Sequence, residues 1–230
     1  MSRIAIIPAR GGSKRIPRKN IRDFLGKPII SYSVKAAIES ELFDEVMVST
    51  DDNEIAEIAA NLGAKVPFIR SEQNSNDIAT TASVLIEVIN EYKHRHNKSF
   101  EYGCCIYPTA PLIKKEHLKN GYNILANQHF NTVFPVVAFG YPVWRGIEVS
   151  EGGKAKMLWP EYLNARSQDL KKVFHDAGQW YWFSVAALLE NNALFTSNSG
   201  VIQLEENEVQ DIDNLVDWNL AEMKYKLLNH

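Results

Sequence analysis

The sequence has few cysteines and no long apolar run. Its 230 residues include two cysteines, Cys104 and Cys105, which are adjacent in the chain. Neighbouring cysteines rarely form a disulfide without strain, so we expect two buried thiols in a reducing compartment. No apolar run approaches the roughly 18 to 20 residues that a membrane span requires. We therefore expect a cytoplasmic protein with no membrane partner.

The sequence also lacks an excess of positive charge. Its formal net charge is −3 at pH 7. Proteins that bind nucleic acids without sequence preference are usually basic, so the composition argues against a nucleic-acid partner. Any site that binds phosphate groups must therefore be a local cluster of positive charge.

Two common phosphate-binding motifs are absent. A short apolar run at residues 4–7 is followed by Arg10-Gly11-Gly12-Ser13-Lys14. A Walker A loop has a second glycine directly before its Lys-Ser/Thr pair, and a dinucleotide fingerprint has three spaced glycines. Neither pattern occurs here, so we expect neither an ATPase nor a dehydrogenase.

Positive charge is instead concentrated in residues 10–20, which we call the basic loop. Its two consecutive glycines allow the backbone to approach a ligand closely and to turn N–H groups toward an anion. This clustering in an acidic chain predicts a polyphosphate ligand, although charge alone leaves open a merely solvated loop. The basic residues are Arg10, Lys14, Arg15, Arg18 and Lys19.

Apolar runs alternate with helical patterns along most of the chain. This alternation is typical of an α/β fold with right-handed crossovers, a mostly parallel sheet and helices on both faces. The pattern breaks at residues 139–173, which predicts a main domain at 1–138 and 174–230 with an inserted lobe at 139–173. We expect strands at residues 4–7, 45–49, 66–69, 102–107, 132–137, 179–183 and 201–204, and helices from Lys27, after Asp51-Asp52, through Val84, at about 115–127 and at 213–228.

Residues 7–14, Ile-Pro-Ala-Arg-Gly-Gly-Ser-Lys, and residues 16–20, Ile-Pro-Arg-Lys-Asn, resemble the signature loop of the acylneuraminate cytidylyltransferases. The resemblance extends over nearly the whole chain. It implies a Rossmann-like nucleotidyltransferase fold and an enzyme that transfers CMP from CTP to a nine-carbon sugar acid. In that family the loop holds the CTP phosphates. The residues implied are Arg10 and Lys14 as chief contacts, with Gly11, Gly12, Ser13 and Asn20 beside them.

The cytosine base is implied to lie against a second segment. Arg70 and residues 77–81, Asp-Ile-Ala-Thr-Thr, resemble the family stretch that reads the base. Ala79 and Thr81 stand where the base is held, and Arg70 where a side chain closes over it. Asp77 and its neighbours could also cap the following helix.

Asp211 and Asp213 stand just before the final helix. In an extended segment, residues two apart point to one face, so both carboxylates could reach one divalent ion. Spacing alone equally allows Asp213 to cap the helix. The family has a matching Asp-x-Asp, so the resemblance implies a site for Mg²⁺, which binds few protein carboxylates. Asp51 is a further candidate, interpreted mainly as a helix cap.

Two segments depart from the sialic acid enzymes of the family. Residues 107–111 read Tyr-Pro-Thr-Ala-Pro instead of Gln-Pro-Thr-Ser-Pro, and residues 175–182 read His-Asp-Ala-Gly-Gln-Trp-Tyr-Trp. Both resemble the pseudaminic acid branch. Pseudaminic acid lacks the terminal hydroxyl of sialic acid, so we expect more apolar and aromatic contact. The implied sugar-binding residues are Tyr107, Thr109, His175, Gln179, Tyr181 and Arg166, with Trp182 adding aromatic surface.

The inserted lobe resembles a dimerisation lobe whose basic residues reach the partner's active site. Residues 166–170 read Arg-Ser-Gln-Asp-Leu, with serine where the family usually has arginine. Arg166 stands one place early. Arg145 and Arg166 are therefore our candidates for the contact with the partner, and we expect a homodimer.

The implied reaction is an in-line displacement. The anomeric hydroxyl attacks the α-phosphorus of CTP and pyrophosphate leaves, with Arg10, Lys14 and Mg²⁺ neutralising the developing charge. Asp211 is our hypothesis for the general base. Sialic, legionaminic and ketodeoxyoctonic acid are alternative substrates. A nucleotide-binding regulatory protein without catalysis is the alternative from another class, and the intact loop and aspartate pair argue against it. The product would supply flagellin glycosylation or a surface polysaccharide.

Overall fold

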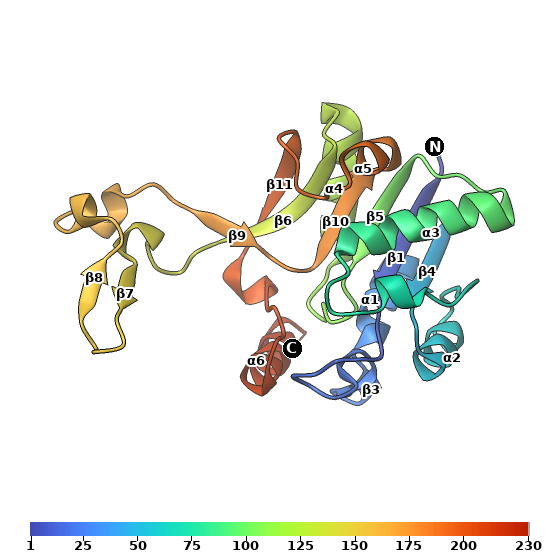
Figure 1. Ribbon diagram of the computed structural model, residues 1–230, viewed down its shortest axis with the longest axis horizontal. Helices are drawn as coiled ribbons and strands as arrows, with labels where there is room; N and C mark the ends of the chain where they lie inside the picture. Colours follow the sequence, from blue (N-terminus) through green and yellow to red (C-terminus); the bar gives the residue numbers. More distant parts are fainter. Residues whose placement is uncertain (230) are drawn as a thin grey trace.

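Seven strands form the central sheet of the computed structural model, which describes residues 1–229 (Figure 1). The strand order is β11-β6-β10-β5-β1-β4, and β9 pairs with β6. The strands are β1 (Arg3–Pro8), β4 (Glu45–Ser49), β5 (Tyr102–Ile106), β6 (Thr132–Ala138), β9 (Phe174–Asp176), β10 (Trp180–Ser184) and β11 (Ser199–Leu204).

The sheet is mixed, so the expectation of a mostly parallel sheet is wrong. Strand β1 runs parallel to β4 and β5, and β11 runs parallel to β6. Strand β10 is antiparallel to both of its neighbours, and β9 is antiparallel to β6. The apolar run of β10 indicates that both faces of this strand are buried. Burial does not indicate whether the strand runs parallel or antiparallel to its neighbours.

Helices cover both faces of the sheet, as expected. Side chains of α1, α2 and α4 form one core cluster with β1, β4 and β5, and side chains of α3 and α5 form another on the opposite face. Helix α6 packs against a small β2–β3 hairpin instead. The bounds are α1 (Ile30–Glu39), α2 (Asn53–Asn61), α3 (Thr81–His96), α4 (Lys115–Gln128), α5 (Val185–Asn191), α6 (Leu215–Leu228), β2 (Asp23–Phe24) and β3 (Lys27–Pro28).

Two local expectations are wrong. Residues 66–69 do not form a strand. The residue before them, Lys65, makes an isolated β-bridge with Met47. Lys27 and Pro28 belong to the β2–β3 hairpin, so α1 begins at Ile30. The expectation of buried thiols is confirmed, because Cys104 and Cys105 are fully buried and unpaired.

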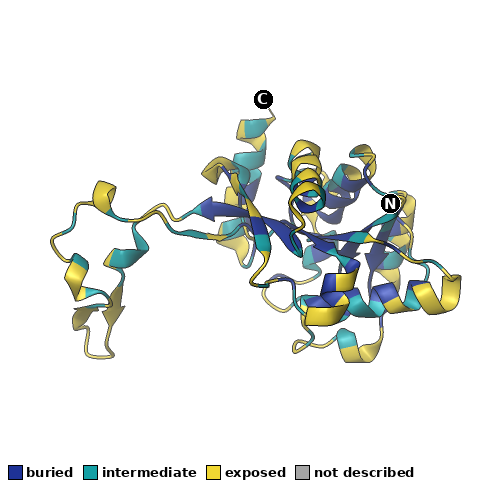
Figure 2. Cartoon of the chain, turned by 90° about the horizontal axis from the view of Figure 1, so that it is seen from above, coloured by how far each residue is buried: buried dark blue, intermediate teal, exposed yellow. Residues whose placement is uncertain are grey.

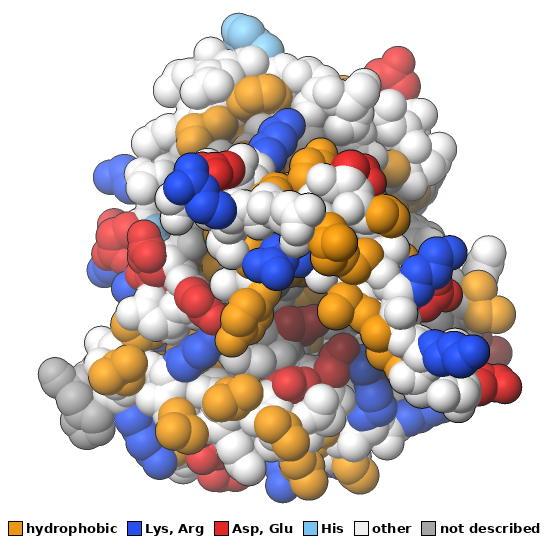
Figure 3. Space-filling view, turned by 90° about the vertical axis from the view of Figure 1, so that its left-hand side faces the viewer, with side chains coloured by type: hydrophobic (Ala, Val, Ile, Leu, Met, Phe, Trp, Pro, Cys, Tyr) orange, Lys and Arg blue, Asp and Glu red, His pale blue; other side chains and the backbone are white. Residues whose placement is uncertain are grey.

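Residues 139–173, which we call the arm, project away from the sheet (Figures 1 and 2). Much of the arm is exposed, and seen from its side of the molecule hydrophobic side chains reach the surface between charged ones (Figure 3). Exposed apolar surface of this kind is typical of contact regions between proteins. The arm contains β7 (Ile147–Val149), β8 (Ala155–Met157) and the 3₁₀ turns η3 (Val143–Arg145), η4 (Pro160–Tyr162) and η5 (Ser167–Asp169).

We examined the helices for one that could cross a membrane. Within residues 1–229, none combines the length and the apolar character that a span requires.

Candidate functional site

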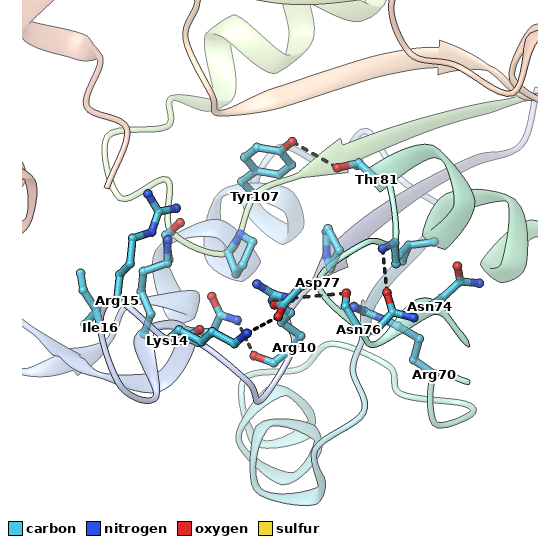
Figure 4. A pocket seen from close by; sticks show the side chains of 18 residues that line it. Arg10, Lys14, Arg15, Ile16, Arg70, Asn74, Asn76, Asp77, Thr81 and Tyr107 are labelled. Carbon is cyan, nitrogen blue, oxygen red and sulfur yellow. Dashed lines mark hydrogen bonds and ion pairs between the residues drawn. The ribbon is translucent and has the colours of Figure 1, made fainter. Parts of the chain in front are cut away.

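A cleft of about 290 Å³ opens where β1 and β5 end (Figure 4). Ligands of open α/β sheets commonly bind at the carboxyl ends of parallel strands, where the loops leave a crevice. Three segments form its walls: the basic loop after β1, the segment leading into α3, and the residues that follow β5. Residues expected at the site that line it are Arg10, Ser13, Lys14, Asn20, Arg70, Ala79, Thr81, Tyr107 and Thr109.

The basic loop is held in shape by hydrogen bonds to its backbone. The buried Asn20 side-chain amide donates to the carbonyl oxygen of Arg10 at 2.9 Å. The Gly11 N–H donates to Asp51 Oδ1, also at 2.9 Å. A Cβ on Gly11 would lie 2.6 Å from Asp52 Oδ2, so this position requires glycine. Asn20 therefore supports the loop as well as lining the cleft.

Of the two adjacent carboxylates after β4, Asp51 does not have the role we assigned. Asp52 caps α2, because its side chain accepts from the Ile55 N–H at 3.0 Å. The interpretation of Asp51 as the cap is wrong, since its carboxylate holds Gly11 instead. Asp52 also pairs with Arg18, whose guanidinium is the main cause that lowers the pKa of this carboxyl.

Arg10 and Lys14 converge on one carboxylate, that of Asp77 (Figure 4). The Arg10 guanidinium lies 2.7 Å from Asp77 Oδ1, and the Lys14 ammonium pairs with Oδ2. Hydrogen bonds from Lys14 and then Arg10 lower the pKa of the Asp77 carboxyl. Thr80 caps α3, so Asp77 does not serve as that cap.

Arg70 is buried at the wall of the cleft. Its Nε donates to Ser49 Oγ at 2.9 Å and its guanidinium also donates to the Ser49 carbonyl oxygen. Burial lowers the pKa of Arg70, which is 7% exposed. The bonds to the end of β4 fix this cation beside the position expected for the base.

Asp211 and Asp213 lie beside the basic loop, although nearly 200 residues separate this aspartate pair from the loop in sequence. Arg15 pairs with Asp213 at 2.6 Å, and the Lys19 ammonium donates to the Ile212 carbonyl oxygen at 2.7 Å. Desolvation and then the charge of Asp213 raise the pKa of the Asp211 carboxyl. The two carboxylates are therefore close enough to repel each other.

The cap of α6 is neither aspartate. Asn214 Oδ1 accepts from the Val216 and Asp217 N–H groups at 2.8 and 3.1 Å. The alternative role of Asp213 as the cap is therefore wrong. Its carboxylate remains directed to the basic loop.

The aromatic residues expected at the sugar lie at different depths. Tyr107 lines the cleft, and its hydroxyl is 3.3 Å from Thr81 Oγ1. Tyr181 lies behind it with ring centroids 5.2 Å apart, and its buried hydroxyl donates to Asp176 Oδ2 at 2.5 Å. Trp182 lies on the opposite face of the sheet and donates to the Leu118 carbonyl oxygen, so it adds nothing to the cleft.

The other expected sugar residues lie outside this cleft. Gln179 is 2% exposed and its amide donates to the Glu208 carbonyl oxygen at 2.6 Å. His175 is exposed on β9 and lines a separate hollow of about 260 Å³ together with Asp211. Asp211 therefore lies where this hollow and the basic loop meet.

Arg145 and Arg166 lie on the arm, which projects away from the sheet (Figure 1), and neither lines the cleft. Both are exposed, and Arg166 Nε donates to Asp169 at 2.8 Å. A single chain therefore does not bring them to the cleft.

Three polar residues of the site had been named only as members of motifs, with no individual contact assigned: Lys19, Asp77 and Asp176. Each stood inside a motif that we had recognised, but their partners lie far away in sequence. The links of Lys19 to Ile212 and of Asp77 to Arg10 become visible only in the folded chain.

Comparison with known proteins now identifies the family. The cytidylyltransferase family model matches residues 4–216. The chain belongs to the cytidylyltransferase family. The match spans the basic loop, the cleft and the aspartate pair.

Two curated relatives align along almost their whole length. A Campylobacter jejuni protein named pseudaminic acid cytidylyltransferase is 44% identical over 230 residues, covering 100% of this chain and 98% of the relative. A Legionella pneumophila protein named CMP-N,N'-diacetyllegionaminic acid synthase is 31% identical, covering 97% and 96%.

A solved structure supports the fold. The structure of CMP:2-keto-3-deoxy-manno-octonic acid synthetase complexed with CTP has a TM-score of 0.71 and 17% identity, covering 100% of this chain and 99% of that one. At this identity the likeness concerns the fold alone.

The requirement for glycine at position 11 can be tested with Gly11→Ala. The new methyl group would meet the Asp52 carboxylate, which Arg18 and the α2 N-terminus hold in place, so the loop has to shift. We expect CTP to bind about tenfold or more weakly in calorimetry, since overpacking costs about 1–3 kcal/mol. The comparison variant is Gly12→Ala, because nothing lies within 4 Å of its new methyl group. Equal CTP affinity in the two variants would contradict the role of Gly11.

Proposed function

We propose that this chain is a pseudaminic acid cytidylyltransferase, which transfers CMP from CTP to the anomeric hydroxyl of pseudaminic acid and releases pyrophosphate. The observation that carries the proposal is the full-length relative of that name at 44% identity. The cleft supports it, because the family's loop and the tyrosine that departs from the sialic acid pattern line the same space. Legionaminic acid is the second candidate, since the relative named for it also aligns along the whole chain.

In this proposal the triphosphate of CTP binds the basic loop. Arg10 and Lys14 supply the charge and Ser13 lines the cleft beside them, whereas the Gly11 N–H is engaged by Asp51. The base then lies against Ala79 and Thr81 on the far wall, beside the fixed guanidinium of Arg70. Binding of this kind holds the α-phosphorus in place and stabilises negative charge that develops on its oxygens.

Asp211 and Asp213 fit a Mg²⁺ ion. Magnesium takes oxygen ligands and usually binds one or two protein carboxylates plus substrate phosphates. Burial and then the charge of Asp213 raise the pKa of Asp211, and a cation between the two carboxylates would relieve their mutual repulsion. When bound there, magnesium would neutralise phosphate charge and orient the reacting oxygens. Within residues 1–229 no cluster of three or more potential ligands competes with this pair.

The sugar acid is proposed to lie between the cleft and the hollow at Asp211. Tyr107, backed by Tyr181, offers aromatic surface to a sugar that lacks a terminal hydroxyl. Thr109 and His175 offer hydrogen bonds at the two ends of this space. Gln179 would contribute by holding the Glu208 segment in place, since its amide is engaged there.

The arm is proposed to make the protein a homodimer with shared sites. The main domain comprises 1–138 and 174–230, and the arm at 139–173 is the inserted dimerisation lobe. Its apolar side chains, such as Ile147, Val149 and Leu163, are more than half exposed in the single chain. In a dimer they would be covered, and Arg145 or Arg166 would reach the partner's cleft.

The substrate is tested by pyrophosphate release from CTP with magnesium, with pseudaminic, legionaminic and sialic acid offered separately. We expect release with pseudaminic acid, at least about tenfold slower release with the other two acids, and loss of release when a chelator removes the metal. Faster release with legionaminic or sialic acid would contradict the proposed substrate while leaving the family assignment intact.

The shared site is tested by mixing two inactive variants, Arg166→Ala and Asp211→Asn. Random pairing puts both types in about half of the dimers, and each mixed dimer has one complete site if the arm acts on its partner. The mixture should therefore recover about a quarter of wild-type activity after subunit exchange. No recovery, with mixed dimers detected by mass, would contradict an arm that acts across the interface.

A further inference from the structure

The two cations assigned to the triphosphate already carry an anion from their own chain. Arg10 lies 2.7 Å from one oxygen of the Asp77 carboxylate, and Lys14 pairs with the other (Figure 4). Arg10 also approaches the Asn76 carbonyl oxygen at 3.4 Å. The Asp77 carboxylate is thus paired with the same two cations that a phosphate group would bind.

The segment that carries Asp77 is anchored at its start, where Ser75 Oγ donates to the Ser71 carbonyl oxygen at 2.7 Å and Asn76 Nδ2 donates to the Gln73 carbonyl oxygen at 2.8 Å. We call residues 75–79 the Asp77 loop. Asn76 Oδ1 accepts from the Ile78 and Ala79 N–H groups, at 2.8 and 2.9 Å, so these bonds close the loop on itself. The Ile78 side chain is 90% exposed and the Asp77 side chain 48%. Among residues 1–229, the Asp77 carboxylate has ion-pair partners in Arg10 and Lys14 alone.

Ion pairs at this exposure are weak enough to be exchanged. Double-mutant measurements on exposed pairs give small coupling energies, since water competes for both partners. A triphosphate carries several charges and more acceptor oxygens than one carboxylate, so it forms the stronger charge-assisted bonds. The charges of the same two cations therefore suit either anion.

We propose that Asp77 is a built-in competitor of the CTP triphosphate, a latch that holds Arg10 and Lys14 until the nucleotide arrives and takes them back when pyrophosphate leaves. This inference rests on the proposed function, because it uses the same phosphate contacts.

The competing account is that Asp77 positions the two cations for the nucleotide. The two accounts predict opposite changes in CTP affinity when Asp77 is removed. A competitor lowers the affinity of the wild type for CTP, so its removal strengthens binding. A positioning residue raises that affinity, so its removal weakens binding.

The test is Asp77→Asn, which removes the charge and keeps the shape. We expect the Kd of CTP, measured by calorimetry without the sugar acid, to fall about three- to tenfold. The inhibition constant of pyrophosphate should fall by a similar factor, because it competes for the same cations. The KM of the sugar acid should stay unchanged. An unchanged or raised Kd of CTP would overturn the proposal.

The matched control is Glu54→Gln. It also removes one exposed negative charge that pairs with the basic loop, but its partner, Arg18, does not line the cleft. We expect the Kd of CTP for Glu54→Gln to match that of the wild type. If this Kd falls as much as that of Asp77→Asn, the change in net charge alone explains the effect, and the proposal is overturned. Wild-type binding is measured first. Absence of CTP binding would contradict the proposed function and the latch together, whereas binding without a shift in Asp77→Asn would overturn the latch alone.

Discussion

The site depends on the need to neutralise like charges crowded into one loop. Five basic side chains fall within residues 10–19, and repulsion between them has to be balanced in a folded chain. Carboxylates from three distant segments supply the balance: Asp52 and Glu54 after β4, Asp77 before α3, and Asp213 before α6. These ion pairs bring the proposed phosphate contacts, the proposed base wall and the aspartate pair to one place.

Much of this arrangement could be predicted from the sequence because its signals are local. The apolar runs identified most strands, and the glycines and cations identified the basic loop. The direction of β10 could not be predicted, since buried strands read alike in either direction. The cap at Asp52 was missed because Asp51 and Asp52 are equally suited in sequence, and only the hydrogen bond from Gly11 separates them.

The sugar side depends on long-range packing, which explains why its prediction was less complete. Alternation along β10 puts Tyr181 toward the cleft side and Trp182 on the other face, so neighbouring aromatics have separate roles. The motif identified the segment but not the depth of each side chain. The arm adds a second limit, because it projects away from the sheet and its Arg166 does not line the cleft of its own chain.

The central claim is that the charge of the basic loop exists to bind a triphosphate. The most direct measurement is a calorimetric titration of the wild type with CTP and with cytidine at several salt concentrations. The account predicts that CTP binds far more tightly than cytidine, and that salt weakens this advantage by screening the exposed cations. Equal affinities for the two ligands, unchanged by salt, would contradict it.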